Sequence, residues 1–226
     1  MAGVGTLNEK PLHAALKARY RGRSGVVEAG VDGYLVDVAL PDELVEIQTG
    51  SFSRIRPKLA DLLDGGHAVR LVHPVAAARW IVKVPDDGSE PTRRKSPHRG
   101  GPLDVCRELV SFPERLAHPG FTLDVVLVHE EQVRRPSRGR AGWRRGGWII
   151  AERRLLEVRD VVTLERPEDL AVLLPAGLPD PFTTAELAAA MGRPRRLAGQ
   201  VAYCLRHAGA AVEVGRDRAG IRYSLT

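Results

Sequence analysis

One segment, residues 34–48 (YLVDVALPDELVEIQ), limits most strongly how this chain folds. Apolar and polar residues alternate on both sides of Pro41-Asp42, a pair typical of tight turns. The alternation predicts two antiparallel strands joined by a two-residue loop. In that register Asp37 lies directly opposite Glu46, so both carboxylates occupy one face of the sheet, roughly 5 Å apart at Cβ.

This pairing of acids has a chemical consequence. Two like charges that close repel each other unless a cation lies between them. Hard divalent ions such as Mg²⁺ prefer oxygen ligands of this kind, and a bound Mg²⁺ polarises a phosphodiester and activates water. Asp37, Glu46 and Gln48 on one face therefore predict metal-dependent phosphodiester hydrolysis. In the alternative interpretation these residues are solvent-facing positions on a half-exposed sheet, but directly opposed like charges are unfavourable and neither strand offers a facing cation.

The flanking sequence predicts an α/β fold. A first helix is expected from near Thr6, which forms a capping box with Glu9, and a second over residues 52–64. Strands are expected at 68–75 and 79–84, followed by a Pro/Gly/basic loop at 85–101. Residues 102–175 show mixed signals that define no fold.

At this point a family resemblance emerges. Asp37, eight intervening residues and then Glu46-Ile47-Gln48 resemble the D-x(n)-(D/E)-x-K signature of the PD-(D/E)XK nuclease superfamily. The resemblance covers residues 6–84 and implies a restriction-endonuclease-like core within a domain of residues 1–175. It implies a Mg-dependent endonuclease in which Glu9, Asp37 and Glu46 hold Mg²⁺ or Mn²⁺. Glu9 as a helix cap alone is the alternative.

The chain departs from the signature at its lysine, which is Gln48 here. The resemblance implies that this position orients the attacking water. Lys58 on the following helix is the candidate replacement, with Arg54 and Arg56 as further candidates. Pro57 leaves the direction of Lys58 open.

Residues 180–226 are predicted to form a separate module. A capping box at residues 183–186, a turn at Gly192, a helix to about Ala208 and two strands follow one another. This order resembles a winged helix-turn-helix domain, in which the second helix enters the major groove of DNA. The side chains that the resemblance places against DNA are Arg193, Arg195, Arg196 and Gln200 on the helix and Arg216, Arg218 and Arg222 on the wing. A winged helix used for protein contacts or dimerisation is the alternative.

Composition agrees with a cytoplasmic DNA-binding protein. The net charge is +6, which favours polyanions, and 43% of the residues are hydrophobic. No apolar run approaches the ~18 residues of a membrane span, and Cys106 and Cys204 are too few for a disulfide framework. Two basic runs, 93–99 and 134–148, are equally well explained as nucleic-acid grips and as solvated loops.

Two hypotheses follow, and both are compatible with a homodimer. The first is a metal-dependent nuclease that cuts DNA. The second is a non-catalytic DNA-binding or regulatory protein on a degenerate nuclease fold. Gln48 favours the second, and the retained pairing of Asp37 with Glu46 favours the first.

Overall fold

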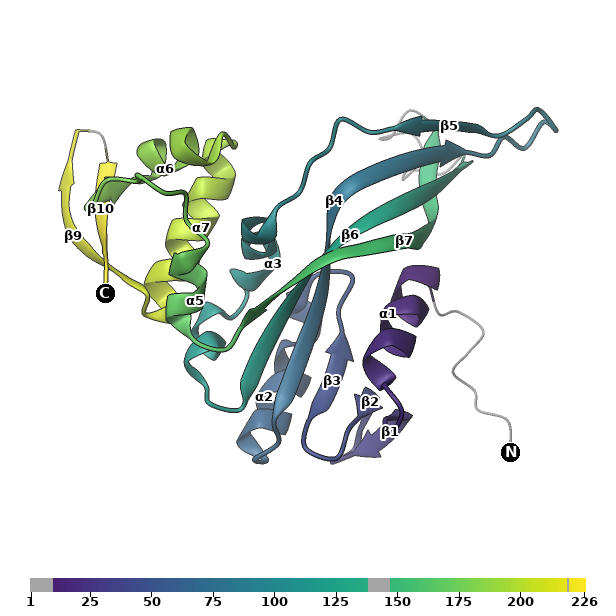
Figure 1. The fold of residues 1–226 in the computed structure, drawn as a ribbon, viewed down its shortest axis with the longest axis horizontal. Coiled ribbons are helices and arrows are strands. Elements are labelled where there is room, and N and C mark those ends of the chain that lie inside the picture. The colour runs from purple at the N-terminus through teal and green to yellow at the C-terminus, as the bar shows by residue number, and fades with distance from the viewer. Residues whose placement is uncertain (1–9, 138–146, 219) are drawn as a thin grey trace.

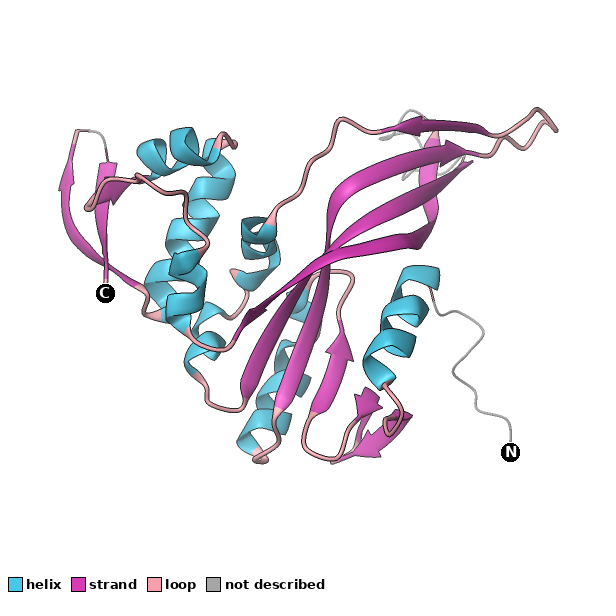
Figure 2. Cartoon of the chain, in the orientation of Figure 1, coloured by secondary structure: helices cyan, strands magenta, loops and turns pink. Residues whose placement is uncertain are grey.

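The computed structural model describes residues 10–137, 147–218 and 220–226, which form a mixed α/β fold. A mixed seven-stranded sheet has the order β1-β2-β3-β4-β6-β7, with β5 paired to β4. A second sheet of three strands, β8-β10-β9, lies at the C-terminal end, on the left of Figure 1. Figure 2 shows that helices flank both sheets. In the part of the chain described, no helix is long and apolar enough to cross a membrane.

The N-terminal elements are α1 (Pro11–Arg21), β1 (Val26–Val31), β2 (Tyr34–Ala39) and β3 (Leu44–Ile47). The helix begins at Pro11, a residue type suited to the first helical turn, and not near Thr6 as expected. The predicted capping box of Thr6 and Glu9 lies outside the described residues. The β2–β3 hairpin has the predicted register, because Val38 pairs with Val45 and Ala39 with Leu44.

A short 3₁₀ turn, η2 (Phe52–Arg54), and α2 (Arg56–Asp64) then lead to β4 (Val69–Lys83), which is parallel to β3. The sequence predicted two strands, at 68–75 and 79–84, where the structure has one. β3 ends opposite Val72, so Pro74 lies where β4 no longer pairs with β3, and its missing N–H breaks no bond to that strand. A register shift between Ala76 and Ala78 is all that remains of the predicted break.

The middle of the chain extends the sheet. Its elements are β5 (Thr92–Lys95), η3 (Pro102–Val105), α3 (Cys106–Leu109), η4 (Pro113–Ala117), β6 (Phe121–Pro136) and β7 (Trp148–Leu164). The predicted loop at 85–101 therefore contains a strand. The outer parts of β4, β6 and β7 and all of β5 form an arm that reaches beyond the helices in Figure 1. Most of the second basic run, residues 138–146, lies outside the described residues.

The C-terminal elements are α5 (Pro167–Val172), β8 (Phe182–Thr183), α6 (Thr184–Met191), α7 (Arg195–Ala208), β9 (Ala211–Asp217) and β10 (Gly220–Leu225). The predicted capping box is present, since Glu186 N donates to Thr183 Oγ1 and Thr183 N donates to Glu186 Oε2. Gly192, with φ 58°, ends α6 in the left-handed conformation that glycine adopts readily. The two predicted helices and the two predicted strands follow in the expected order.

Two hydrophobic clusters hold the sheet. On one face, Leu12 and Leu16 of α1 pack against β2, β3 and β6. On the other face, a larger cluster contains Phe52, stacked on Phe112 at 5.4 Å between ring centroids. This second cluster continues without a break into the buried side of α7, including Leu197 and Val201. Residues of the C-terminal module and of the large sheet thus share one core.

Candidate functional site

The site begins where β2 and β3 separate. Only two residue pairs join these strands, although β2 extends back to Tyr34 and β3 on to Ile47. At the point of separation the carboxylates replace the lost ladder bonds. Ile47 N donates to Asp37 Oδ2 at 2.8 Å, and Asp37 N lies 3.4 Å from Glu46 Oε1. The structure therefore brings Asp37 and Glu46 together, as the predicted register requires.

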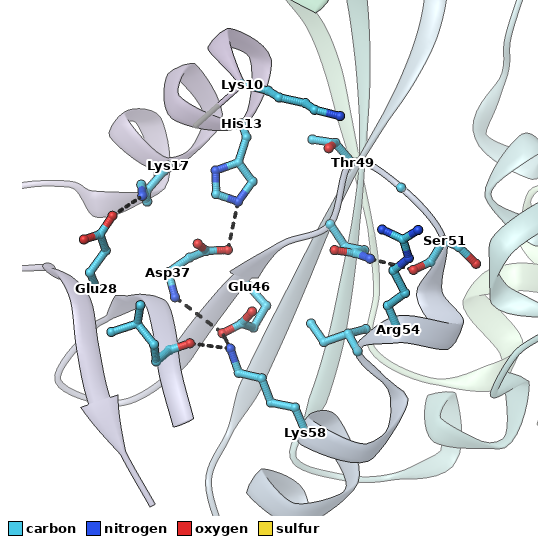
Figure 3. A pocket seen from close by; sticks show the side chains of 14 residues that line it. Lys10, His13, Lys17, Glu28, Asp37, Glu46, Thr49, Ser51, Arg54 and Lys58 are labelled. Atoms are coloured by element: carbon cyan, nitrogen blue, oxygen red, sulfur yellow. Dashed lines mark hydrogen bonds and ion pairs between the residues drawn. The ribbon is translucent and has the colours of Figure 1, made fainter. Parts of the chain in front are cut away.

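A cavity of about 640 Å³ opens over these two acids, as Figure 3 shows. One wall is α1 and Glu28 of β1, and another is the start of α2. The turn of residues 48–51, called the rim loop below, borders the cavity where β3 ends. The cationic side chains in the lining are Lys10, Lys17, Arg54 and Lys58, with His13 beside them.

Asp37 is held in its ionised form. Burial by itself raises the pKa of this carboxyl, but the hydrogen bond from His13 and the backbone N–H of Ile47 outweigh it, so the pKa is lowered. His13 Nε2 lies 3.2 Å from Asp37 Oδ2. Asp37 is therefore the acid of the pair that carries a full negative charge most readily.

The pKa of Glu46 is shifted in the opposite direction. Its side chain is 7% exposed, and burial raises its pKa. Contact with Lys58 offsets only part of that effect, and the charge of Asp37 raises the pKa further. Lys58 Nζ touches Glu46 Oε1 and also donates to the carbonyl of Leu35 at 2.6 Å. The direction of Lys58 that the sequence left open is therefore toward the acids.

The two arginines considered beside Lys58 differ in position. Arg54 lines the cavity. Arg56 is 60% exposed and lies 4.0 Å from Glu114, and it does not line the cavity.

Gln48 lines the cavity, but its side chain serves the rim loop. Its amide nitrogen donates to the carbonyl of Ser51 at 2.6 Å. Its own carbonyl accepts from His73 Nδ1 at 2.7 Å, and its backbone N–H donates to Val72. Gln48 thus fixes the rim loop from within, and its only side-chain donor group already holds a partner.

The donor set for a metal is small. Glu9 lies outside the described residues, and across the described ranges no group of three or more His, Cys, Asp or Glu side chains is arranged to hold a metal ion. Each acid nevertheless keeps one oxygen, Asp37 Oδ1 and Glu46 Oε2, for which no partner is found among the residues described. Two carboxylate oxygens thus remain for a cation.

The α1 side chains were missed by the sequence interpretation. Lys10, His13 and Lys17 follow one another at spacings of three and four residues, which places them on one face of a helix. Lys17 is 8% exposed and lies 3.2 Å from Glu28. The spacing indicates a shared helix face from the sequence alone. That this face meets Asp37 and Glu46 depends on how α1 packs against the β2–β3 hairpin.

The predicted DNA contacts divide into two groups. Arg193, in the turn between α6 and α7, contacts Asp104 and the carbonyl of Arg99, so it ties this turn to the segment that follows β5. Arg222 pairs with Asp217 at 2.7 Å. The remaining arginines of the prediction are exposed on α7 and the hairpin, namely Arg195, Arg196, Arg216 and Arg218. Gln200 is half-buried, and its Oε1 is buried without a hydrogen-bond partner among the described residues.

Comparison with known proteins places the site within the part of the chain that matches a protein family. Residues 10–165 match a family described as "Domain of unknown function (DUF8091)". A protein of Treponema pallidum (strain Nichols), described as an uncharacterized protein, is 34% identical over 187 residues, which make up 82% of this chain and 73% of that protein. No solved structure matches the chain. The family match includes every residue of the cavity, and the chain belongs to the DUF8091 family.

Proposed function

We propose that this protein is a metal-dependent nuclease that hydrolyses DNA, built on a core of the PD-(D/E)XK kind. The observation that carries the proposal is the meeting of Asp37, Glu46 and Lys58 in one cavity at the point where β2 and β3 separate. The element order α1-β1-β2-β3-α2-β4 supports it. The acids occupy adjacent strands, and the lysine enters from the next helix.

The residues present fit Mg²⁺ or Mn²⁺. Mg²⁺ is often held by only one or two carboxylates and completes its shell with waters and substrate phosphates. Asp37 Oδ1 and Glu46 Oε2 would be the protein ligands, and no third side chain is required. The ion would supply Lewis-acid polarisation of the phosphodiester and a more acidic bound water.

The cationic side chains have separate tasks in this proposal. Lys58 neutralises Glu46 in the free protein and stabilises negative charge on the phosphate when substrate is bound. His13 orients Asp37 through the bond to Oδ2, so Oδ1 would be the oxygen available to hold a metal ion. Lys10 and Arg54, which both line the cavity, attract the DNA backbone.

The C-terminal elements support a winged helix that binds the same DNA. The order α5-β8-α6-α7-β9-β10 and the sheet order β8-β10-β9 fit that fold. Arg195 and Arg196 at the start of α7 face solvent, as groove contacts require, and Arg216 and Arg218 are exposed at the end of the hairpin. Arg193 is assigned instead to the contact with Asp104.

The arm adds a further basic surface. All four residues of β5 are exposed, and three of them are Arg93, Arg94 and Lys95. Trp80 lies beneath two of these cations, with the Arg93 guanidinium 5.3 Å and the Lys95 ammonium 5.2 Å from the ring centroid. The first three residues of the basic run 93–99, which the sequence left undecided, therefore lie in a strand suited to phosphate contacts.

One observation favours the alternative, a non-catalytic DNA-binding or regulatory protein. Lys58 already neutralises Glu46, so the two acids coexist in the free protein without a metal. The pairing of the two acids therefore does not depend on catalytic function, and a non-catalytic protein could retain it.

A plasmid cleavage assay in Mg²⁺ or Mn²⁺ separates the two functions. We expect Asp37→Asn and Glu46→Gln each to reduce cleavage at least ~100-fold, as loss of a group that acts in the transition state commonly does. Asp42→Asn, at the exposed hairpin turn, is the matched control and should cut like the wild type. A wild type that binds DNA but does not cut, or cutting that survives both substitutions, refutes the nuclease.

A further inference from the structure

A second cavity, of about 240 Å³, lies on the other side of the rim loop. Thr49, Gly50 and Ser51 line both this cavity and the one over the acids. The two cavities are thus neighbours with a common wall. A polymer with regularly spaced charged groups that entered one of these cavities would also pass the other cavity.

The wall of the second cavity is built around a fully buried charge. Glu130 of β6 is 0% exposed and lies between Arg79 of β4 and Arg153 of β7. Arg79 Nε is 2.5 Å from Glu130 Oε1, and Arg153 Nε is 2.8 Å from Glu130 Oε2. A buried carboxylate requires such pairing. Two cations are therefore fixed in place by one anion.

Arg79 has donors to spare. A guanidinium carries five N–H groups. Among the described residues, the side chain of Arg79 makes one bond, through Nε. Arg153 uses Nη1 for the carbonyl of Thr49 at 3.1 Å and so ties the cavity wall to the rim loop. The terminal amino groups of Arg79 are free to bind a ligand, and the residue lines the cavity.

The charge of the cavity suits one anion. Its ionised lining residues are Arg79, Arg107 and Arg153 against Asp104 and Glu108. Behind this lining, Glu130 adds one negative charge, and Arg193, which contacts Asp104, adds one positive charge. Burial lowers the pKa of His98 and of His73, so the two histidines of the lining add no charge at neutral pH. The excess of one positive charge offsets the single negative charge of one phosphodiester group.

We propose that the second cavity binds a backbone phosphate of the DNA strand, adjacent to the phosphate held over Asp37 and Glu46. The inference rests on the proposed nuclease function, because it takes the substrate of that site as its ligand. The planar fork of an arginine matches the oxygens of a phosphate, and rigid placement lowers the entropy lost on binding. Arg79 is the binding group, and Glu130 and Arg153 position it.

The test is a phosphate-neutralisation scan. Duplexes that carry a single uncharged methylphosphonate, at each position in turn, are titrated with the full chain in Ca²⁺ by fluorescence anisotropy. In the wild type we expect one position next to the cleaved bond to weaken binding about 10-fold, the size of a charge-assisted bond. In Arg79→Gln that penalty should disappear, while Glu130 keeps Arg153 as its partner.

Arg154→Gln is the matched control. Arg154 is 49% exposed and pairs with Glu152, and it follows Arg153 in a strand, so it points to the other face. Its penalty profile should equal that of the wild type. If Arg79→Gln unfolds at a lower temperature than the wild type, Arg79→Lys is used in its place. A lysine keeps a positive charge beside Glu130 but lacks the planar guanidinium, so the penalty should be reduced. A profile in these Arg79 variants equal to that of the wild type overturns the proposal.

The outcomes separate this inference from the nuclease proposal. If the wild type cuts DNA but no penalty depends on Arg79, only the phosphate site is refuted. If a penalty depends on Arg79 but nothing is cut in Mg²⁺ or Mn²⁺, the nuclease is refuted and the phosphate site stands. Absence of DNA binding by the wild type refutes both.

Discussion

His73 provides a sharp test of how the rim loop is held. The side chain is 8% exposed, and Nδ1 donates to the carbonyl of Gln48 at 2.7 Å. Burial lowers the pKa of His73 from 6.5 to about 4, although the bond to Gln48 opposes the change, and the charge of Arg153 lowers the pKa further. The folded protein therefore keeps this imidazole neutral at a pH where the unfolded chain protonates it.

The sign and size of the effect on stability follow from this shift. Below the unfolded pKa of 6.5 the unfolded chain binds more protons, so stability falls as the pH decreases toward the folded value of about 4. A difference of that size corresponds to about 3 kcal/mol at its limit. Between about pH 8 and about pH 5.5 the predicted loss is between 1 and 2 kcal/mol.

Urea unfolding at these two pH values measures the loss. In His73→Gln the dependence on pH should be smaller by the predicted 1 to 2 kcal/mol, because that variant has no imidazole at this position. His207→Gln, on the exposed side of α7, should behave like the wild type. An equal dependence on pH in His73→Gln and the wild type would refute the neutral, buried histidine.

Two further predictions concern the contact between α7 and the rest of the protein. Cys106 and Cys204 are buried, and contact with Cys106 together with burial raises the pKa of the Cys204 thiol. Neither cysteine should therefore react with Ellman's reagent until the chain is unfolded. A reaction in the native state would contradict the packing. Arg193→Ala removes one of the two arginines that contact the buried carboxylate of Asp104 and should lower the free energy of unfolding by ~1–3 kcal/mol. Arg195→Ala should change it by less than ~0.5 kcal/mol and weaken DNA binding instead. Urea titration and anisotropy distinguish the two arginines, and equal effects of both would contradict their assignment.

Local patterns in the sequence were enough for the hairpin. Pro41-Asp42 fixes the loop, and a side-chain period of two leaves only one register that buries Val36 and Val38. The position of Asp37 opposite Glu46 follows from these two facts. The same holds for the capping box of Thr183, whose partner lies only three residues away.

What could not be predicted depends on long-range contacts. β4 runs through Pro74 because its neighbour β3 has already ended, which no local pattern records. The basic residues of β5 form a strand only because β4 is there to pair with them. Lys58 reaches Glu46, and Arg193 reaches Asp104, through the packing of elements distant in sequence. Charge alone therefore could not distinguish a DNA contact from an internal ion pair.

The hydrophobic cluster shared by α7 and the large sheet has a consequence for how DNA would be read. Side chains pack across this boundary, so the packing holds α7 at a fixed distance from the carboxylate cavity. On the proposed function, a duplex gripped by α7 would be cut at a constant number of base pairs from the grip, whatever its sequence. Fragment ends mapped at nucleotide resolution would reveal that fixed offset.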